Sequence, residues 1–364
     1  MKRRTFLIGT GTSAVAMVPT YPAPAIAQGI RELKLVTSWP KDFPGFGTSA
    51  VRLAQAITGA SGGRLAVKVF AADELVSAFE VFDAVAGGVA DMYHSAEYYW
   101  HDRSAAFSFF TAVPFGLTAE EMNAWIYHGG GQDLWDELSA EFNIKPLLCA
   151  NTGVQMGGWF TKELTSVDSY RDLRMRIPGL GGEVLRRLGG NAVSLPGGQI
   201  VSALQSGAID AAEWVGPWSD LALGLHDATK FYYYPGFHEP GTSLSLGINK
   251  TLWDSLNDED RQVIQAAATA ENCFAKAEFD AENAIALETL VKTHGVQLRK
   301  FDDAILQTIG KISEQMLAEI GDGDALIRRV YQSFLKFRKS AMKKGEVTQS
   351  AYLHARRLAV RIGE

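Results

Sequence analysis

The chain has 364 residues, of which 47% are hydrophobic and 21% are charged. Acidic residues outnumber basic residues by 41 to 35, and this formal net charge of −6 argues against a nucleic-acid partner, because phosphate binding requires a basic surface. The length exceeds what a single hydrophobic core usually serves, so we expect two lobes.

The first 27 residues have the features of an export signal. Three basic residues at 2–4 precede an apolar stretch, and Ala-Ile-Ala at 25–27 matches a cleavage site. The paired arginines followed by Thr-Phe-Leu at 5–7 indicate twin-arginine export, with an ordinary secretory signal as the alternative. No later stretch offers the ~20 apolar residues of a membrane span. We therefore expect cleavage after Ala27 and a soluble periplasmic protein.

Strand and helix patterns alternate through the first two thirds of the mature chain. We expect strands over 32–39, 64–70, 90–95, 174–177, 191–195 and 208–214, and helices over 47–61, 78–88, 166–173, 181–190 and 197–207. This alternation predicts open α/β sheets. It places the first lobe at 28–150 plus about 242–275, and the second at 151–241 plus part of the C-terminal helices.

The last third reads differently. From residue 251 to 364 it is nearly all helical in pattern, and the longest helix is expected over 262–295. The basic, amphipathic helix at 327–360 has an apolar stripe that either dimerises or packs along its own chain. Cys149 and Cys273 are too few for a disulfide framework, and we expect both to be buried and unpaired.

Two arginines stand out in the segment "DLRMRIPG". Arg174 and Arg176 share one face of the predicted strand, because side chains alternate along a strand. A guanidinium matches a carboxylate through two parallel hydrogen bonds. The pair therefore indicates an anion site, with a solvated strand face as the alternative.

Oxygen-bearing side chains lie in two other segments. Asn151 and Gln155 occur in "NTGVQMGGWF", and Glu213 interrupts the apolar run "IDAAEWVGPW". A buried, unpaired carboxylate costs several kcal/mol or takes up a proton, so Glu213 must face water, a basic group or a cation. Amide and carboxylate oxygens suit Na⁺ or Ca²⁺ rather than zinc.

The remaining motifs favour a binding protein over an enzyme. Aromatic runs at 97–102, 125–131, 157–160, 213–218 and 231–241 suit a pocket for a small polar ligand, unless they only pack the lobes. The sequence contains no G-x-S-x-G, Walker A or G-x-G-x-x-G motif, and its seven histidines have no metal-ligand spacing. We interpret each histidine as a surface or structural group. An exported enzyme with a cofactor is the alternative.

Several segments together resemble the extracytoplasmic receptors of TRAP transporters. They are "NTGVQMGGWF", "DLRMRIPG", "SALQSGAIDAAEWVGP" and "YYYPGFHEPG", and the similarity covers essentially the whole mature chain. It is closest to the branch that binds 2-oxo acids with a sodium ion, which "AVPFGL", "AWIYHGGG" and the Tyr-Tyr-Trp run at 98–100 also match. The resemblance implies an α/β, two-lobe periplasmic-binding-protein fold with a long C-terminal helical extension.

The resemblance also implies roles for single residues. Arg176 would salt-bridge the ligand carboxylate, while Arg174 faces solvent or supports its neighbour. Asn151 would hold the carboxylate or keto oxygen, and Tyr99 would close the pocket from the first lobe. Trp214 and Gln155 would complete the substrate site.

The same resemblance implies a cation and two protein partners. The ligands of the cation, Na⁺ or alternatively Ca²⁺, would be Gln155, Glu213, the backbone carbonyl of Trp214 and Glu239. The receptor would deliver a small 2-oxo acid such as pyruvate or 2-oxobutyrate to a membrane permease, and would form a homodimer. Lactate, another 2-hydroxy acid or a longer carboxylate remains an alternative ligand on the same scaffold.

Overall fold

The computed structural model describes residues 29–358, so the predicted signal at 1–27 and the last two residues of the predicted helix at 327–360 lie outside the described part. The first of two sheets has the strand order β2-β1-β3-β10-β4. Its strands are β1 (Arg31–Thr37), β2 (Leu65–Phe70), β3 (Met92–Ser95), β4 (Ile144–Asn151) and β10 (Ser243–Asn249). β1 runs parallel to β2 and β3, whereas β10 is antiparallel to β3 and β4.

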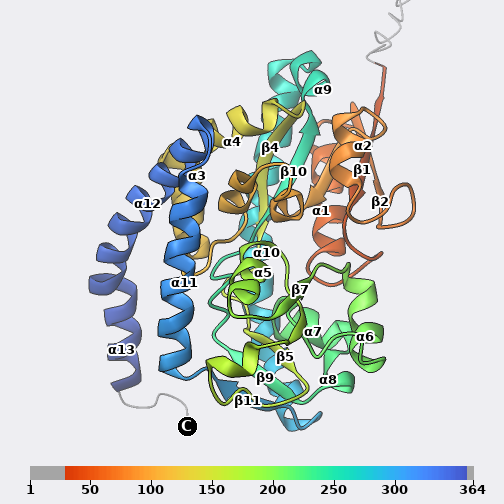
Figure 1. The fold of residues 1–364 in the computed structure, drawn as a ribbon. Coiled ribbons are helices and arrows are strands. Elements are labelled where there is room, and N and C mark those ends of the chain that lie inside the picture. Colours follow the sequence, from red (N-terminus) through yellow and green to blue (C-terminus); the bar gives the residue numbers. More distant parts are fainter. Residues whose placement is uncertain (1–28, 359–364) are drawn as a thin grey trace, which may run out of the picture.

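The second sheet has the order β11-β9-β5-β8-β6-β7. Its strands are short: β5 (Gly158–Phe160), β6 (Arg174–Arg176), β7 (Asn191–Val193), β8 (Ala211–Ala212), β9 (Phe231–Tyr234) and β11 (Gln297–Lys300). β6 lies parallel to both β7 and β8, so the chain ends of β6 and β8 point the same way. Figure 1 shows the first sheet in the upper half of the molecule and the second in the lower half.

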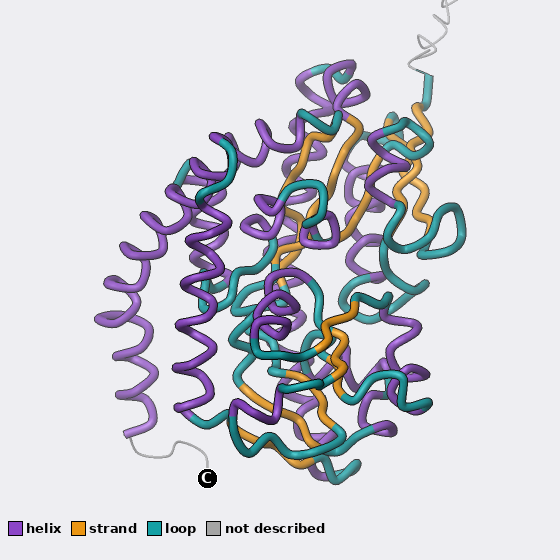
Figure 2. Tube along the Cα trace, viewed as in Figure 1, coloured by secondary structure: helices purple, strands orange, loops and turns teal. Residues whose placement is uncertain are grey.

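Helices pack on both sheets, as the tube in Figure 2 shows. Those near the first sheet are α1 (Gly47–Ala60), α2 (Val81–Ala86), α3 (Ala119–His128), α4 (Gly131–Ala140) and α9 (Lys250–Ser255), with the 3₁₀ turns η1 (Glu97–Trp100) and η2 (Ala105–Phe110). Those near the second are α5 (Gly179–Arg187), α6 (Gly197–Gln205), α7 (Pro217–Leu223) and α8 (Leu225–Ala228), with the 3₁₀ turn η3 (Val167–Tyr170). Each helix contributes an apolar face to a core that includes large aromatic side chains such as Trp125 and Phe82.

The chain passes between the sheets at three places. It leaves the first sheet after β4, returns to it between β9 and β10, and leaves it again along α10 (Asp258–Lys292), which leads to β11. α10 packs on β4 and α1 of the first half and on α7 of the second. Its buried residues extend from Asp260 to Leu290, so this one helix supports both halves.

The C-terminal helices form a separate layer along one side (Figure 1). α11 (Asp303–Gly321) packs beside α12 (Ala325–Gly345), which a π-helical turn, η4 (Glu346–Ser350), joins to α13 (Ala351–Leu358). The first half of α12 is anchored by Phe334, whose ring lies 5.3 Å from Trp125 and 5.4 Å from Phe109. In contrast, no residue of α13 is buried.

The two-sheet fold with long C-terminal helices confirms the predicted fold class. Some local predictions were wrong. The segment 166–173 forms only the 3₁₀ turn η3, capped by Ser166, and the helical last third contains β11, which pairs with β9. Cys149 and Cys273 are both free, as expected, but Cys273 is exposed because it lies on the outer face of α10.

Close packing between two strands gives a test of the fold. Gly247 on β10 lies opposite Tyr93 on β3, and a β-carbon at Gly247 would be 1.9 Å from the Tyr93 ring. We expect Gly247→Ala to lower the free energy of unfolding by about 1–3 kcal/mol, because Tyr93 is buried and must move. Urea unfolding of purified protein measures the change.

The control is Gly198→Ala on α6. A β-carbon at Gly198 meets no atom within 4 Å, so this variant should be neutral or slightly stabilising. Equal stability of the two variants would contradict the packing argument.

Candidate functional site

A fully buried arginine lies at the centre of the polar cluster between the halves. Arg176 ends β6, and its side chain is 0% exposed. Its Nη1 donates to the backbone carbonyl of Glu213 at 2.6 Å and lies 3.3 Å from Glu213 Oε2, while its Nε donates to the carbonyl of Leu195 at 3.1 Å. The Trp214 ring lies 5.0 Å from the guanidinium carbon. These contacts fix the guanidinium plane, and Nη2 has no partner among residues 29–358.

The arginine and the acidic groups lie close together because of two features of the fold: the ends of strands in the second sheet, and the crossings, which are the segments where the chain passes from one sheet to the other. Arg176 and Glu213 lie at the carboxyl ends of the parallel strands β6 and β8, and the Glu213 amide donates to the Arg176 carbonyl at 2.9 Å. Gln155 lies on the crossing after β4, and Glu239 on the crossing before β10. The backbone amide of Gln155 donates to the backbone carbonyl of Glu239 at 3.1 Å, and this bond joins the two crossings. Ligand sites of open α/β sheets form at such strand ends.

Unpaired oxygen atoms converge beside the arginine. Gln155 donates its amide hydrogens to Thr152 and Thr242, which leaves Oε1 without a partner in the described chain. Thr242 in turn donates to Glu239 Oε2 at 2.5 Å. Glu213 Oε1 also has no hydrogen-bond partner in the described chain, and it lies 3.6 Å from His238 Nε2. Buried oxygen atoms of this kind are costly without a partner, so they indicate a place for a cation.

The electrostatics of the cluster agree with that interpretation. Burial raises the pKa of Glu213 to about 7, against the opposing effect of Arg176. Burial also raises the pKa of Glu239 to about 8, and repulsion from Glu213 adds to it. One arginine therefore does not neutralise two buried carboxylates. A cation between them would favour their ionised forms.

The other predicted residues occupy different positions. Asn151 is buried, but its amide donates to the Gly241 carbonyl and to Ser243, and its oxygen accepts from the Gly153 amide. In this conformation Asn151 therefore holds the two crossings together. Tyr99 is half-buried on η1, and burial raises its pKa while nearby Arg176 opposes that shift. Arg174 is 46% exposed and forms a bidentate pair with Asp210, so only one arginine of the pair belongs to the buried cluster.

Comparisons with known proteins place the chain in a family. Residues 35–324 match the family described as bacterial extracellular solute-binding protein, family 7. A monocarboxylate 2-oxoacid-binding periplasmic protein of Nostoc sp. is 39% identical over 97% of this chain and 98% of its own length. The chain belongs to the family 7 solute-binding proteins. It is thus an extracytoplasmic binding protein and not an enzyme.

Solved structures of TRAP solute-binding proteins share the fold. The protein of Pseudoalteromonas atlantica, with bound sodium and pyruvate, has a TM-score of 0.86 and 34% identity, and the match covers 89% of this chain and 98% of that one. The protein of Bordetella bronchiseptica, a dimer with calcium and picolinate in one site, has a TM-score of 0.87 and 32% identity over 89% and 96%. Both cations therefore occur in relatives of this chain. Among its described helices, none is long and apolar enough to cross a membrane.

Aromatic side chains of both halves meet over the site of this solute-binding protein. The Trp214 ring lies 6.4 Å from Trp39, 6.0 Å from Phe43 and 5.8 Å from Phe46. Tyr98, on η1, contacts Gly179 at the start of α5 across the junction. Arg176 and Glu213, which are both 0% exposed, are therefore covered by aromatic side chains from both halves.

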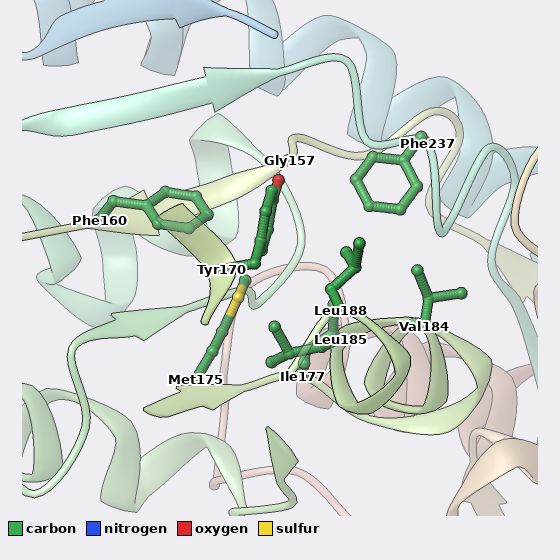
Figure 3. Close-up of a pocket in the computed structure, with 10 residues that line it drawn as sticks. Gly157, Phe160, Tyr170, Met175, Ile177, Val184, Leu185, Leu188 and Phe237 are labelled. Carbon is green, nitrogen blue, oxygen red and sulfur yellow. The ribbon is translucent and has the colours of Figure 1, made fainter. Parts of the chain in front are cut away.

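A separate apolar cavity lies in the second half, lined by residues such as Phe160, Tyr170 and Phe237 (Figure 3). Its volume is about 10 Å³, which is room for about one water molecule. Figure 3 shows almost only carbon atoms around it. It is a packing defect and not the solute site.

Three residues near the site escaped the sequence analysis. His238 is fully buried beside Glu213 and Glu239, whereas we interpreted each histidine as a surface or structural group. Tyr98 reaches the second half, although only its neighbour Tyr99 was selected. Asp220 accepts from Trp159 Nε1 at 2.8 Å, from the Tyr232 hydroxyl at 2.6 Å and from the Val215 amide at 3.1 Å. Of these three residues, only His238 could have been found from the sequence, because it directly precedes Glu239 in "FHEPG".

A buried carboxylate at the start of η1 gives a pH-dependent prediction. Glu97 accepts from the Tyr93 hydroxyl at 2.8 Å, and burial raises its pKa to about 7. The folded state therefore binds one more proton than the unfolded state between about pH 4.5 and 7, and stability falls as the pH rises through that window. We expect the free energy of unfolding to fall by about 1–2 kcal/mol more in the wild type than in Glu97→Gln between pH 5 and 7.5, measured with urea. Parallel pH profiles would contradict it.

Proposed function

We propose that this protein is the receptor of a TRAP transporter and captures a small 2-oxo monocarboxylate, such as pyruvate, together with a cation. The observation that carries the proposal is the free Nη2 of buried Arg176 beside the unpaired oxygens of Glu213 and Gln155. The guanidinium nitrogen can donate to an anion, and the carboxylate and amide oxygens can coordinate a cation. A 2-oxo acid can bind both at once, because its carboxylate and keto oxygens chelate the cation.

The cation would be held by Gln155, Glu213, the backbone carbonyl of Trp214 and Glu239. These are oxygen donors, which suit Na⁺ and Ca²⁺. With both carboxylates ionised, Arg176, a divalent ion and one bound anion make a neutral site, while Na⁺ leaves one negative charge. The sodium and calcium found in the two structural relatives are both consistent with this set.

Binding would act through closure of the two lobes. The proposed lobes are 28–150 plus about 242–275, and 151–241 plus part of the C-terminal helices. Tyr99 and Trp39 come from the first, while Arg176 and Trp214 come from the second, so the ligand and cation contact both only in the closed form. Their binding stabilises that form by the difference in affinity. The closed receptor then docks on a membrane permease. Before that, residues 1–27 direct export of the protein and are removed by cleavage after Ala27.

A homodimer is the third part of the proposal. Although α12 is anchored on its own chain, η4 and α13 expose large apolar side chains: Val347 is 77% exposed, Tyr352 65% and Leu358 74%. A groove of about 690 Å³ beside α11 and α12 has a mixed lining, with apolar residues such as Leu317, Tyr331 and Met342 and charged residues such as Glu314, Arg338 and Lys339. We propose that α13 of a second copy covers these surfaces. The Bordetella bronchiseptica relative is a dimer.

Thermal unfolding of refolded, ligand-free protein tests the ligand. We expect pyruvate and 2-oxobutyrate to raise the melting temperature only when Na⁺ or Ca²⁺ is present, because the cation bridges ligand and carboxylates. At about 100 times the Kd the added stability is about 2.7 kcal/mol. A larger shift with lactate would identify the 2-hydroxy acids as the ligand class, and no shift with any small carboxylate would contradict the proposal.

A matched arginine pair is the internal control. Arg176→Ala should abolish the ligand-dependent shift, because the buried guanidinium is the only positive group proposed to hold the carboxylate. Arg174→Ala, which removes an exposed partner of Asp210, should retain it. The ligand-dependent increment is compared, so a lower baseline stability does not affect the result. A retained shift in Arg176→Ala would disprove its role.

The dimer is tested by introducing negative charges on α13. We expect the wild type to elute as a dimer in gel filtration with light scattering. The double variant Tyr352→Glu and Leu353→Glu should be a monomer, because two carboxylates cannot be buried between apolar surfaces. Both side chains are exposed in the single chain, so the fold should be unchanged by circular dichroism. A monomeric wild type would rule out the proposed interface.

A further inference from the structure

We propose that His238 adds a nitrogen ligand to the cation site, so that Glu213, His238 and Glu239 bind a borderline divalent ion such as Zn²⁺ or Co²⁺. The proposal deepens the proposed function, because it concerns the same pocket. It differs in the metal class, since the oxygen ligands inferred above suit hard ions only.

The environment of His238 requires an explanation. Its side chain is 0% exposed, and neither ring nitrogen has a hydrogen-bond partner in the part of the chain that the structure describes. A buried imidazole normally uses both nitrogens, and leaving a buried polar atom unpaired costs free energy. The packing does not provide partners, since its β-carbon lies against Gly181 of α5 and its ring lies near Phe237. His238 is therefore not a structural histidine satisfied by the fold.

The geometry fits a shared metal ion. His238 Nε2 lies 3.6 Å from Glu213 Oε1, and one ligand atom from each of Glu213, His238 and Glu239 lies within 4.8 Å of the others. Ligand atoms bound to one ion at about 2.0–2.2 Å are separated by roughly 3–3.6 Å. The first pair already has that spacing, and a small rotation of Glu239 would bring the third ligand into range.

The ligand types decide the class of ion. Na⁺ and Ca²⁺ are coordinated by oxygen, and an imidazole nitrogen adds nothing to their binding. Imidazole with carboxylates suits zinc, cobalt and nickel. Two overlapping ligand sets thus share Glu213 and Glu239: one is completed by Gln155 and binds hard ions, and the other is completed by His238 and binds borderline ions. A divalent ion also balances the two carboxylates in charge.

Cobalt is the probe, because its visible absorption reports its coordination number and ligand field, and comparison with a variant that lacks the imidazole then reports the nitrogen ligand. Metal-free, ligand-free full-length protein is titrated with CoCl₂. We expect a visible band that saturates at one ion per chain, is removed by Zn²⁺ and weakens when excess Ca²⁺ competes for the shared carboxylates. The variant His238→Gln should bind Co²⁺ at least tenfold more weakly while keeping its Ca²⁺ affinity within about threefold.

A pair of histidines away from the site supplies the control. The His226 and His294 rings are 4.0 Å apart and could bind the probe independently. The double variant His226→Gln and His294→Gln should retain the saturating band and its competition by Ca²⁺. An unchanged Co²⁺ affinity in His238→Gln, or no saturable band in the wild type, would overturn the proposal.

The two proposals can fail separately. Pyruvate binding with Na⁺ or Ca²⁺ is measured on the same preparations. Pyruvate binding without any cobalt band would disprove the role of His238 and leave the receptor function intact. If His238→Gln does not fold, the Co²⁺ affinity of His238→Asn is measured instead, with the same loss expected, because competition between Ca²⁺ and Co²⁺ tests only the shared Glu213 and Glu239.

Discussion

The buried pair of Arg176 and Glu213 is the interaction on which the rest of the structure depends. Both side chains are withdrawn from water, and breaking such a pair by removing one partner typically costs about 3–5 kcal/mol. Yet the pair is incomplete, because one guanidinium nitrogen and one carboxylate oxygen have no partner in the described chain. Replacing a buried ion pair by apolar groups of similar volume is often neutral or stabilising, so stability alone does not account for this pair.

The residues around Arg176 and Glu213 fix the position of the pair but do not supply all of its hydrogen-bond partners. Asp220 accepts three hydrogen bonds, one of them from the Val215 amide directly after Glu213 and Trp214. The Val215 carbonyl accepts from the Met156 amide, next to Gln155. The backbone of this segment is thus fixed at Val215 and, through the bond from the Glu213 amide to the Arg176 carbonyl, at Glu213 itself. Preorganisation of this kind raises affinity because less freedom is lost on binding.

The fold class could be predicted from local patterns in the sequence, whereas the choice of Arg176 over Arg174 and the cation ligands Gln155 and Glu239 came from the resemblance to a family. Alternating strands and helices, an arginine on a short strand and a carboxylate inside an apolar run are visible without coordinates. β11 was missed because "QLRK" has no apolar alternation and becomes a strand only through its pairing with β9. The exposure of Cys273 depends on which face of α10 turns outward, and the weak periodicity of that helix did not decide it.

Other residues of the site depend on contacts that no spacing encodes. Asp220 matters because the fold brings α7 against β5 and β9, where its hydrogen-bond partners Trp159 and Tyr232 lie 61 residues before it and 12 residues after it in the chain. Asn151 shares a segment with Gln155, but its amide is used to hold the crossings. His238 directly precedes Glu239 in the chain, but only the folded structure brings both of them beside Glu213.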